Sequence, residues 1–144
     1  MIFIPMKLPA HWEWIMLRTK VRPTAAAKGV VAIDKNGDVA AAVLFDDWTQ
    51  TSGAIHIAIE NPMVIRRGFL DACTYYFYRV CGKLQMIGTI PADNARSIQF
   101  AKRLGFEEQC RIPDGWDHKI DLVILTMREA QYRNAQTDLY SNAA

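Results

Sequence analysis

The sequence predicts an α/β fold in which helices flank a mixed β-sheet, and three observations carry that prediction. Residues 29–34 and 39–45 are apolar runs around the turn Lys35–Asp38, whose Asn-Gly pair is typical of a tight β-hairpin. Residues 55–60 alternate between apolar and polar side chains, as a half-buried strand does. From residue 68 onward, helical spacing alternates with apolar strands, which predicts a strand-helix-strand-helix core with a parallel strand pair.

Length, composition and charge limit the class of protein. The 144 residues suffice for one domain, which we place at 1–128, followed by a polar tail at 129–144 with weak helical character. No apolar run reaches the roughly 20 residues of a membrane span, and the apolar opening at 1–6 lacks the features of a signal peptide. The three cysteines form no CxxC pair, so we expect a cytoplasmic protein without membrane partners or a metal site. The net charge of +2 is too small to demand a nucleic-acid partner.

The remaining elements follow from local signals. Helical spacing of Trp12, Ile15 and Met16 predicts a short helix that ends before Pro23. A second helix runs from about Gly68 to Gly82, with Phe69, Ala72, Cys73, Tyr76 and Val80 on its apolar stripe.

In the last third of the chain, strands are predicted at 84–90, 106–112 and 118–127, with a turn at 113–115. Between the first two of these strands, Asp93 or Asn94 caps a helix that ends at Gly105.

The most informative motif lies at residues 92–106. Its Asn94, Ser97, Leu104, Gly105 and Phe106 closely resemble the GNAT superfamily of acyltransferases, whose members move an acyl group from coenzyme A to an amine. The resemblance implies a GNAT-like fold over residues 29–128, acetyl-CoA as acyl donor, and Asn94 and Ser97 beside the pantetheine arm. From the residues alone, Asn94 can cap the helix or reach a ligand amide.

The resemblance also implies a pyrophosphate loop after the strand at 55–60. That loop would include Arg66, Arg67, Gly68 and Phe69, and a backbone N–H near Ile59 would polarise the acyl oxygen. Gly68 alone matches a loop glycine, because Leu70 stands where a second small residue is expected.

Ala101 stands where many GNAT enzymes have a tyrosine that protonates the leaving thiolate. In this respect the chain looks like the branch that acetylates ribosomal-protein N-termini and antibiotics, and like compact phage and bacterial members. The resemblance makes Ser97 a candidate proton donor. The alternative is that the Ser97 hydroxyl forms a hydrogen bond with the backbone of its own helix.

A general base is also needed, and Glu60 at the end of the strand is the leading candidate. His56 points to the same face, roughly 13 Å away by strand rise, and is the next candidate. Asp46 and Asp47 are further alternatives.

The acceptor is an amine of unknown class: a small molecule, a protein or a nucleic acid. Asp114, Trp116 and Asp117 in the predicted last hairpin could hold a cationic amine or simply form a turn. Three alternatives stay open: a GNAT-fold module without activity, an enzyme that modifies nucleic-acid bases, and a homodimer joined through the polar tail and the aromatic residues 75–78.

Overall fold

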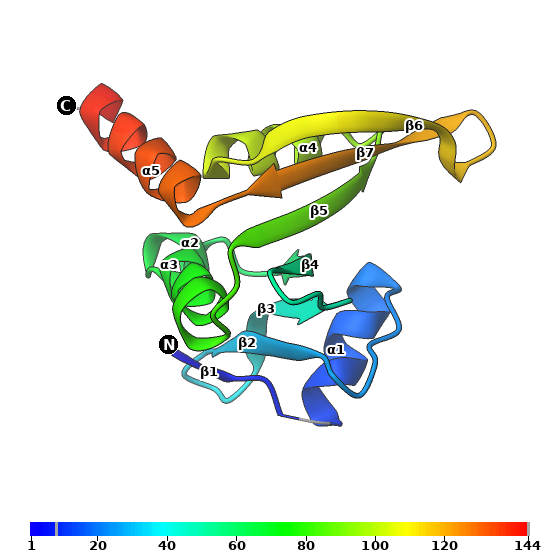
Figure 1. Cartoon of the computed structure of the whole chain (residues 1–144). Helices are drawn as coiled ribbons and strands as arrows, with labels where there is room; N and C mark the ends of the chain where they lie inside the picture. Colours follow the sequence, from blue (N-terminus) through cyan, green and yellow to red (C-terminus); the bar gives the residue numbers. More distant parts are fainter. Residues whose placement is uncertain (8, 144) are drawn as a thin grey trace. The chain divides into compact units, whose positions relative to one another are not determined.

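The computed structural model describes residues 1–7 and 9–143, which form two compact units, Met1–Lys83 and Leu84–Ala144. Figure 1 shows the helices and strands of each unit along the chain. The order of elements after β4 is helix, strand, helix and two strands, as the sequence predicts.

The first unit is built on four antiparallel strands in the order β1-β2-β3-β4. They are β1 (Ile2–Pro5), β2 (Lys28–Ile33), β3 (Val39–Asp46) and β4 (Ser52–Ile59). The predicted hairpin is present as β2 and β3, and β3 pairs with β4 in a register that places Leu44 opposite His56. Strand β1, paired with β2, was not predicted from the sequence.

Helices cover both faces of this sheet. Helix α1 (Ala10–Thr19) packs Ile15 into a core cluster with Ala42 and Leu44 on one face. Phe45 points to the other face, where its ring lies 4.8 Å from that of Phe77. The faces are therefore distinct: α1 covers one, and α3 (Phe69–Tyr75) with the π-helical turn after it covers the other.

The predicted helix over residues 68–82 is present, but its last turn is not a regular α-helix. The chain forms the short helix α2 (Met63–Arg66), then α3, then a π-helical turn at Tyr76–Val80, closed by the Cys81 N–H donating to the Tyr76 carbonyl at 2.8 Å. The wider turn shifts the buried stripe by one residue. Phe77 is therefore fully buried, whereas Val80, predicted on the apolar stripe, is 61% exposed.

The second unit contains β5 (Gln85–Pro91), α4 (Ala95–Leu104), β6 (Glu107–Asp117), β7 (Ile120–Met127) and α5 (Glu129–Ala143). Its strands are antiparallel in the order β5-β7-β6. The weak helical character of the tail is present as α5, in which Tyr132 is buried.

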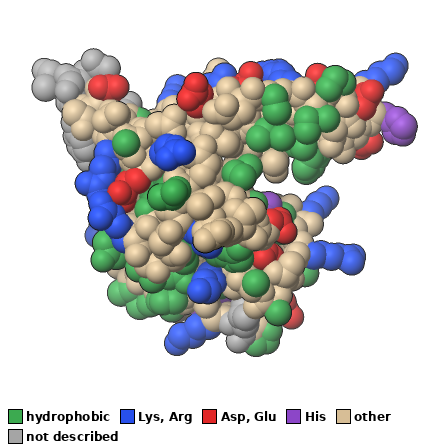
Figure 2. All heavy atoms as spheres, in the orientation of Figure 1, with side chains coloured by type: hydrophobic (Ala, Val, Ile, Leu, Met, Phe, Trp, Pro, Cys, Tyr) green, Lys and Arg blue, Asp and Glu red, His purple; other side chains and the backbone are tan. Residues whose placement is uncertain are grey.

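The predicted turn at 113–115 is wrong. Strand β6 runs through these residues, and the chain reverses at 118–119 instead. The register shifts between Ile112 and Asp117, and Asp114 has a left-handed φ of 52°. The Pro-Asp-Gly sequence thus forms an irregularity inside a long hairpin, which Figure 2 shows with hydrophobic side chains on its surface. Trp116, which belongs to this hairpin, is 56% exposed.

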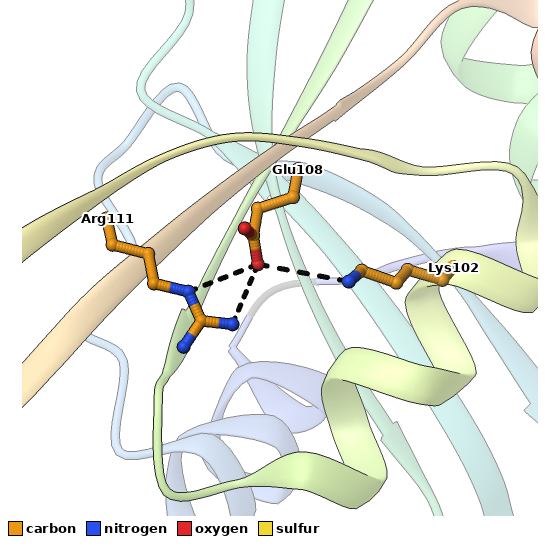
Figure 3. A network of polar contacts seen from close by, with 3 residues as sticks. All are labelled: Lys102, Glu108 and Arg111. Atoms are coloured by element: carbon orange, nitrogen blue, oxygen red, sulfur yellow. Dashed lines mark hydrogen bonds and ion pairs between the residues drawn. The ribbon is translucent and has the colours of Figure 1, made fainter.

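A small ion-pair network links α4 to β6. The Arg111 guanidinium donates to Glu108 Oε1 at 2.9 Å, and Lys102 Nζ lies 3.9 Å from the same oxygen (Figure 3). The hydrogen bond from Arg111 keeps the pKa of Glu108 below its ordinary value. Because these groups are exposed, the network contributes little to stability.

Gly105, which ends α4, cannot accept a side chain without strain. Its φ is 119°, and an added Cβ would lie 2.6 Å from the Gln131 carbonyl oxygen. We expect Gly105→Ala to lower the free energy of unfolding by about 2–3 kcal/mol, measured by urea denaturation. Gly37→Ala is the matched control, since Gly37 has a φ of 84° but nothing within 4 Å of an added Cβ. Equal losses for the two variants would contradict the clash at Gln131.

Candidate functional site

The loop between β4 and α3 carries two exposed arginines. Arg66 ends α2, Arg67 follows it, and Gly68 has a left-handed φ of 86° that turns the chain into α3. Within the described residues, no carboxylate lies within ion-pair distance of either arginine. The two guanidinium groups are thus available to an anionic ligand.

Two other predicted coenzyme contacts lie near this loop in sequence. The Phe69 ring is fully buried and lies 5.3 Å from that of Phe3, so its side chain belongs to the core. Ile59 is the last residue of β4, is half-buried and pairs with Ala41. Only the backbone of Phe69 is therefore suited to contact a ligand.

His56 and the end of β4 lie on the face that α1 covers. The register places His56 opposite Leu44 and Ala58 opposite Ala42, and both of these β3 residues belong to the cluster around Ile15. The Glu60 N–H continues the ladder by donating to the Ala40 carbonyl at 3.0 Å. The sequence-based prediction that His56 and Glu60 share a face is consistent with this register.

His56 is half-buried, and its surroundings favour the neutral imidazole. Burial lowers the pKa of His56 below its ordinary value of 6.5, and the carboxylates of Asp47 and Asp46 only partly oppose that shift. A neutral imidazole can accept a proton at neutral pH. His56 is therefore in the deprotonated form that a general base requires.

Asp46 has a structural role. Burial tends to raise its pKa, but hydrogen bonds from Thr24 and from the Asp47 N–H outweigh burial and bring the pKa below its ordinary value. Both oxygens are used, because the Thr24 N–H and hydroxyl each donate to the carboxylate at 2.7 Å. Asp46 therefore fastens the segment after α1 to the end of β3.

Glu60 is engaged by a cation from α1. Arg18 Nε donates to Glu60 Oε1 at 2.7 Å, and the Arg18 guanidinium lies 3.7 Å from the centre of the Trp14 ring. The Glu60 side chain is 55% exposed, so the ion pair lies at the surface. The Glu60 carboxylate is therefore placed to hold a cation, and in this structure that cation is Arg18.

An open cavity of about 530 Å³ lies beside this ion pair. The residues that line it include Asp34, Asp38 and Glu60, together with Trp14. Asp34 is held in place because its Oδ1 accepts the N–H groups of Asn36 and Asp38. The cavity therefore combines negative charge with an aromatic surface, which suits a cationic ligand.

Sequence reasoning missed most of this cavity. The sequence predicts Asp34 at the end of a strand and Asp38 in the turn that follows, and its basic residue Arg18 fits either a nucleic-acid substrate or solvated surface charge. A usable signal was present: Trp14 and Arg18 are four residues apart on a predicted helix and so lie on one face.

In the second unit, Asn94 caps α4, as one of its two predicted roles requires. The Ser97 N–H donates to Asn94 Oδ1 at 3.1 Å. The other predicted acceptor cluster forms a turn, because Asp114 Oδ1 accepts the Lys119 N–H and Asp117 Oδ1 accepts the His118 N–H.

The described residues contain no group of three or more His, Cys, Asp or Glu side chains that could hold a metal ion. Nor does any helix among them have the length and apolar character needed to cross a membrane.

Comparison with known proteins identifies the fold. No protein-family model matches the chain, and no curated protein matches it by sequence. A solved chimera of the spermidine N-acetyltransferase SpeG from Vibrio cholerae and hSSAT aligns with a TM-score of 0.74 at 10% identity, over 92% of this chain and 99% of that chain. A mutant of the Vibrio cholerae SpeG enzyme aligns with a TM-score of 0.67 at 12% identity, over 88% and 77% of the two chains. The same enzyme in complex with manganese ions aligns with a TM-score of 0.66 at 13% identity, over 87% of this chain and 77% of that chain.

These solved structures are GNAT-fold acetyltransferases, so the chain has the GNAT fold. The α/β fold class predicted from the sequence is confirmed.

Proposed function

We propose that this chain is an N-acetyltransferase that moves an acetyl group from acetyl-CoA to a cationic amine. The observation that carries the proposal is the likeness of nearly the whole chain to solved acetyltransferases. The pair Arg66 and Arg67, without carboxylate partners in the described residues, supports binding of the coenzyme pyrophosphate.

The acceptor proposed first is a linear polyamine. The cavity lined by Trp14, Asp34, Asp38 and Glu60 offers several negative charges and one ring, which suits a ligand with several ammonium groups. The solved neighbours are spermidine acetyltransferases by name, which supports the same class.

The proposed reaction is a direct attack without a covalent enzyme intermediate. His56 first takes a proton from the reacting ammonium group, and Glu60 holds positive charge elsewhere on the acceptor. The free amine nitrogen then bonds to the thioester carbonyl carbon, the C–S bond breaks, and coenzyme A leaves as a thiolate, which receives the second proton that the nitrogen loses. Asn94 and Ser97 keep the roles that the GNAT resemblance implies: both contact the pantetheine arm, and Ser97 protonates the thiolate. A backbone N–H near Ile59 polarises the acyl oxygen.

The test is a thiol-release assay with acetyl-CoA and four acceptors, with products identified by mass spectrometry. The acceptors are spermidine, n-butylamine, a ribosomal-protein N-terminal peptide and an oligonucleotide. We expect spermidine to be acetylated with the highest kcat/KM. Preferred acetylation of the peptide or the oligonucleotide would replace the polyamine assignment. Absence of turnover with every amine would refute the transferase and favour a binding module.

A further inference from the structure

Arg18 occupies a position that matches the recognition chemistry of an ammonium ligand. Its guanidinium stacks on the Trp14 ring at 3.7 Å, and its Nε donates to Glu60 at 2.7 Å. A ring face beside a carboxylate is the arrangement in which proteins hold organic cations. In this chain the protein's own arginine fills that arrangement.

The surrounding charge is not balanced by Arg18 alone. Three acidic residues, Asp34, Asp38 and Glu60, line the cavity, and Arg18 pairs with only the last. Asp34 and Asp38 lie in the turn between β2 and β3, where backbone hydrogen bonds fix Asp34. The cavity thus keeps two carboxylates that can attract a further cation.

The contacts of Arg18 are weak enough to exchange. Its side chain is 30% exposed and that of Glu60 is 55% exposed, so solvent screens their attraction. Arg18 Nη1 also donates to the Trp14 carbonyl within α1 at 3.0 Å. That local bond can keep the arginine beside the helix after it has left Glu60.

We propose that Arg18 is an intramolecular competitor for the acceptor cation, and that a polyamine enters the cavity by displacing the guanidinium from Trp14 and Glu60. This inference rests on the proposed function. It makes Arg18 a specificity-determining residue. A ligand with one positive charge would only replace the contacts that Arg18 already makes with Glu60 and the Trp14 ring. A ligand with two or three charges also engages the two remaining carboxylates.

The test compares spermidine binding to the full chain by isothermal titration without acetyl-CoA. Replacing Arg18→Gln is expected to tighten spermidine binding by about 5- to 30-fold, the combined strength of an exposed ion pair and one cation–π contact. Arg18→Met, which keeps the aliphatic stem over Trp14, is the second variant if the first does not fold. Arg22→Gln is the matched control, since it removes the same charge from an exposed position just beyond α1.

The outcomes separate this inference from the proposed function. Tighter binding in both Arg18 variants but not in Arg22→Gln supports displacement, and adding Glu60→Gln to Arg18→Gln should remove the gain. Unchanged or weaker spermidine binding in the Arg18 variants would overturn the inference. Arg18 would then have only a structural role, linking α1 to the end of β4 through Glu60. An equal gain in Arg22→Gln would also overturn it, because bulk charge would then suffice. If the wild type acetylates no amine, the transferase proposal fails while the titration still decides the role of Arg18.

Discussion

Replacing His56→Gln is expected to lower kcat for acetyl transfer by about 10²- to 10⁴-fold, the usual contribution of a positioned general base. Glutamine keeps the polar character and approximate size of the side chain but cannot take up a proton. The expectation follows from two features of the site: His56 is half-buried with a lowered pKa, and Glu60 is engaged by Arg18. Steady-state kinetics with spermidine or the best acceptor measures the effect.

The pH profile tests the same assignment. Because burial lowers the pKa of His56 below 6.5, the imidazole is already neutral at pH 7 and becomes protonated only at lower pH. We therefore expect kcat of the wild type to fall as the pH drops below about 6.5, and this acidic limb to disappear in His56→Gln. The free energy of unfolding should also decrease as the pH drops through this range. The reason is that His56 has the higher pKa in the unfolded chain, which therefore binds the proton more readily than the folded chain does.

Glu60→Gln is the companion variant for this experiment. If Glu60 holds the acceptor cation, its loss should raise KM more than it lowers kcat. If kcat of Glu60→Gln fell below one hundredth of the wild-type value while kcat of His56→Gln stayed within threefold of it, Glu60 would be the general base instead.

Replacing both Arg66→Ala and Arg67→Ala is expected to weaken acetyl-CoA binding by about 100-fold. Each charge-assisted contact to a phosphate contributes about 1.5 kcal/mol at an exposed position, and each 1.4 kcal/mol is tenfold in affinity. Calorimetric titration measures the loss, which should shrink as salt is raised because exposed charges are screened.

Two controls make this prediction specific. Acetyl-pantetheine lacks the pyrophosphate, so its affinity should be the same for the wild type and the double variant. Arg22→Ala with Arg128→Ala removes the same net charge from exposed positions elsewhere and should leave acetyl-CoA binding unchanged. Equal weakening of acetyl-CoA and acetyl-pantetheine would show that the loop does not contact the phosphates.

The features predictable from the sequence are those set by local signals. The Asn-Gly turn, the strand predicted from residue 55 onward and the Asn94 cap depend on neighbours within a few positions, and each is present in the structure. The end of α4 at the Leu-Gly-Phe sequence is also set locally. Gly105 has a φ of 119°, which only a glycine adopts without strain.

The features missed from the sequence depend on packing between distant segments. The π-helical turn at Tyr76–Val80 brings Phe77 against Phe45, and no periodic rule indicates the inserted residue. The pair of Arg18 with Glu60 joins positions 42 residues apart. The Pro-Asp-Gly sequence at 113–115 favours a turn locally, but it forms an irregularity in β6, and the chain reverses only at 118–119, between the paired residues Asp117 and Ile120.

The anchoring of α1 determines how quickly its cavity can admit a ligand. After the helix, Thr24 is bound to Asp46, and before it the Met6 N–H donates to the Gly29 carbonyl at 2.8 Å. With the chain fastened to the sheet on both sides, entry of a cation needs only rotation of the Arg18 side chain. Exposed side chains rotate within picoseconds to nanoseconds, whereas collective helix shifts take microseconds or longer. Ligand entry should therefore be limited by diffusion rather than by a rearrangement of the fold.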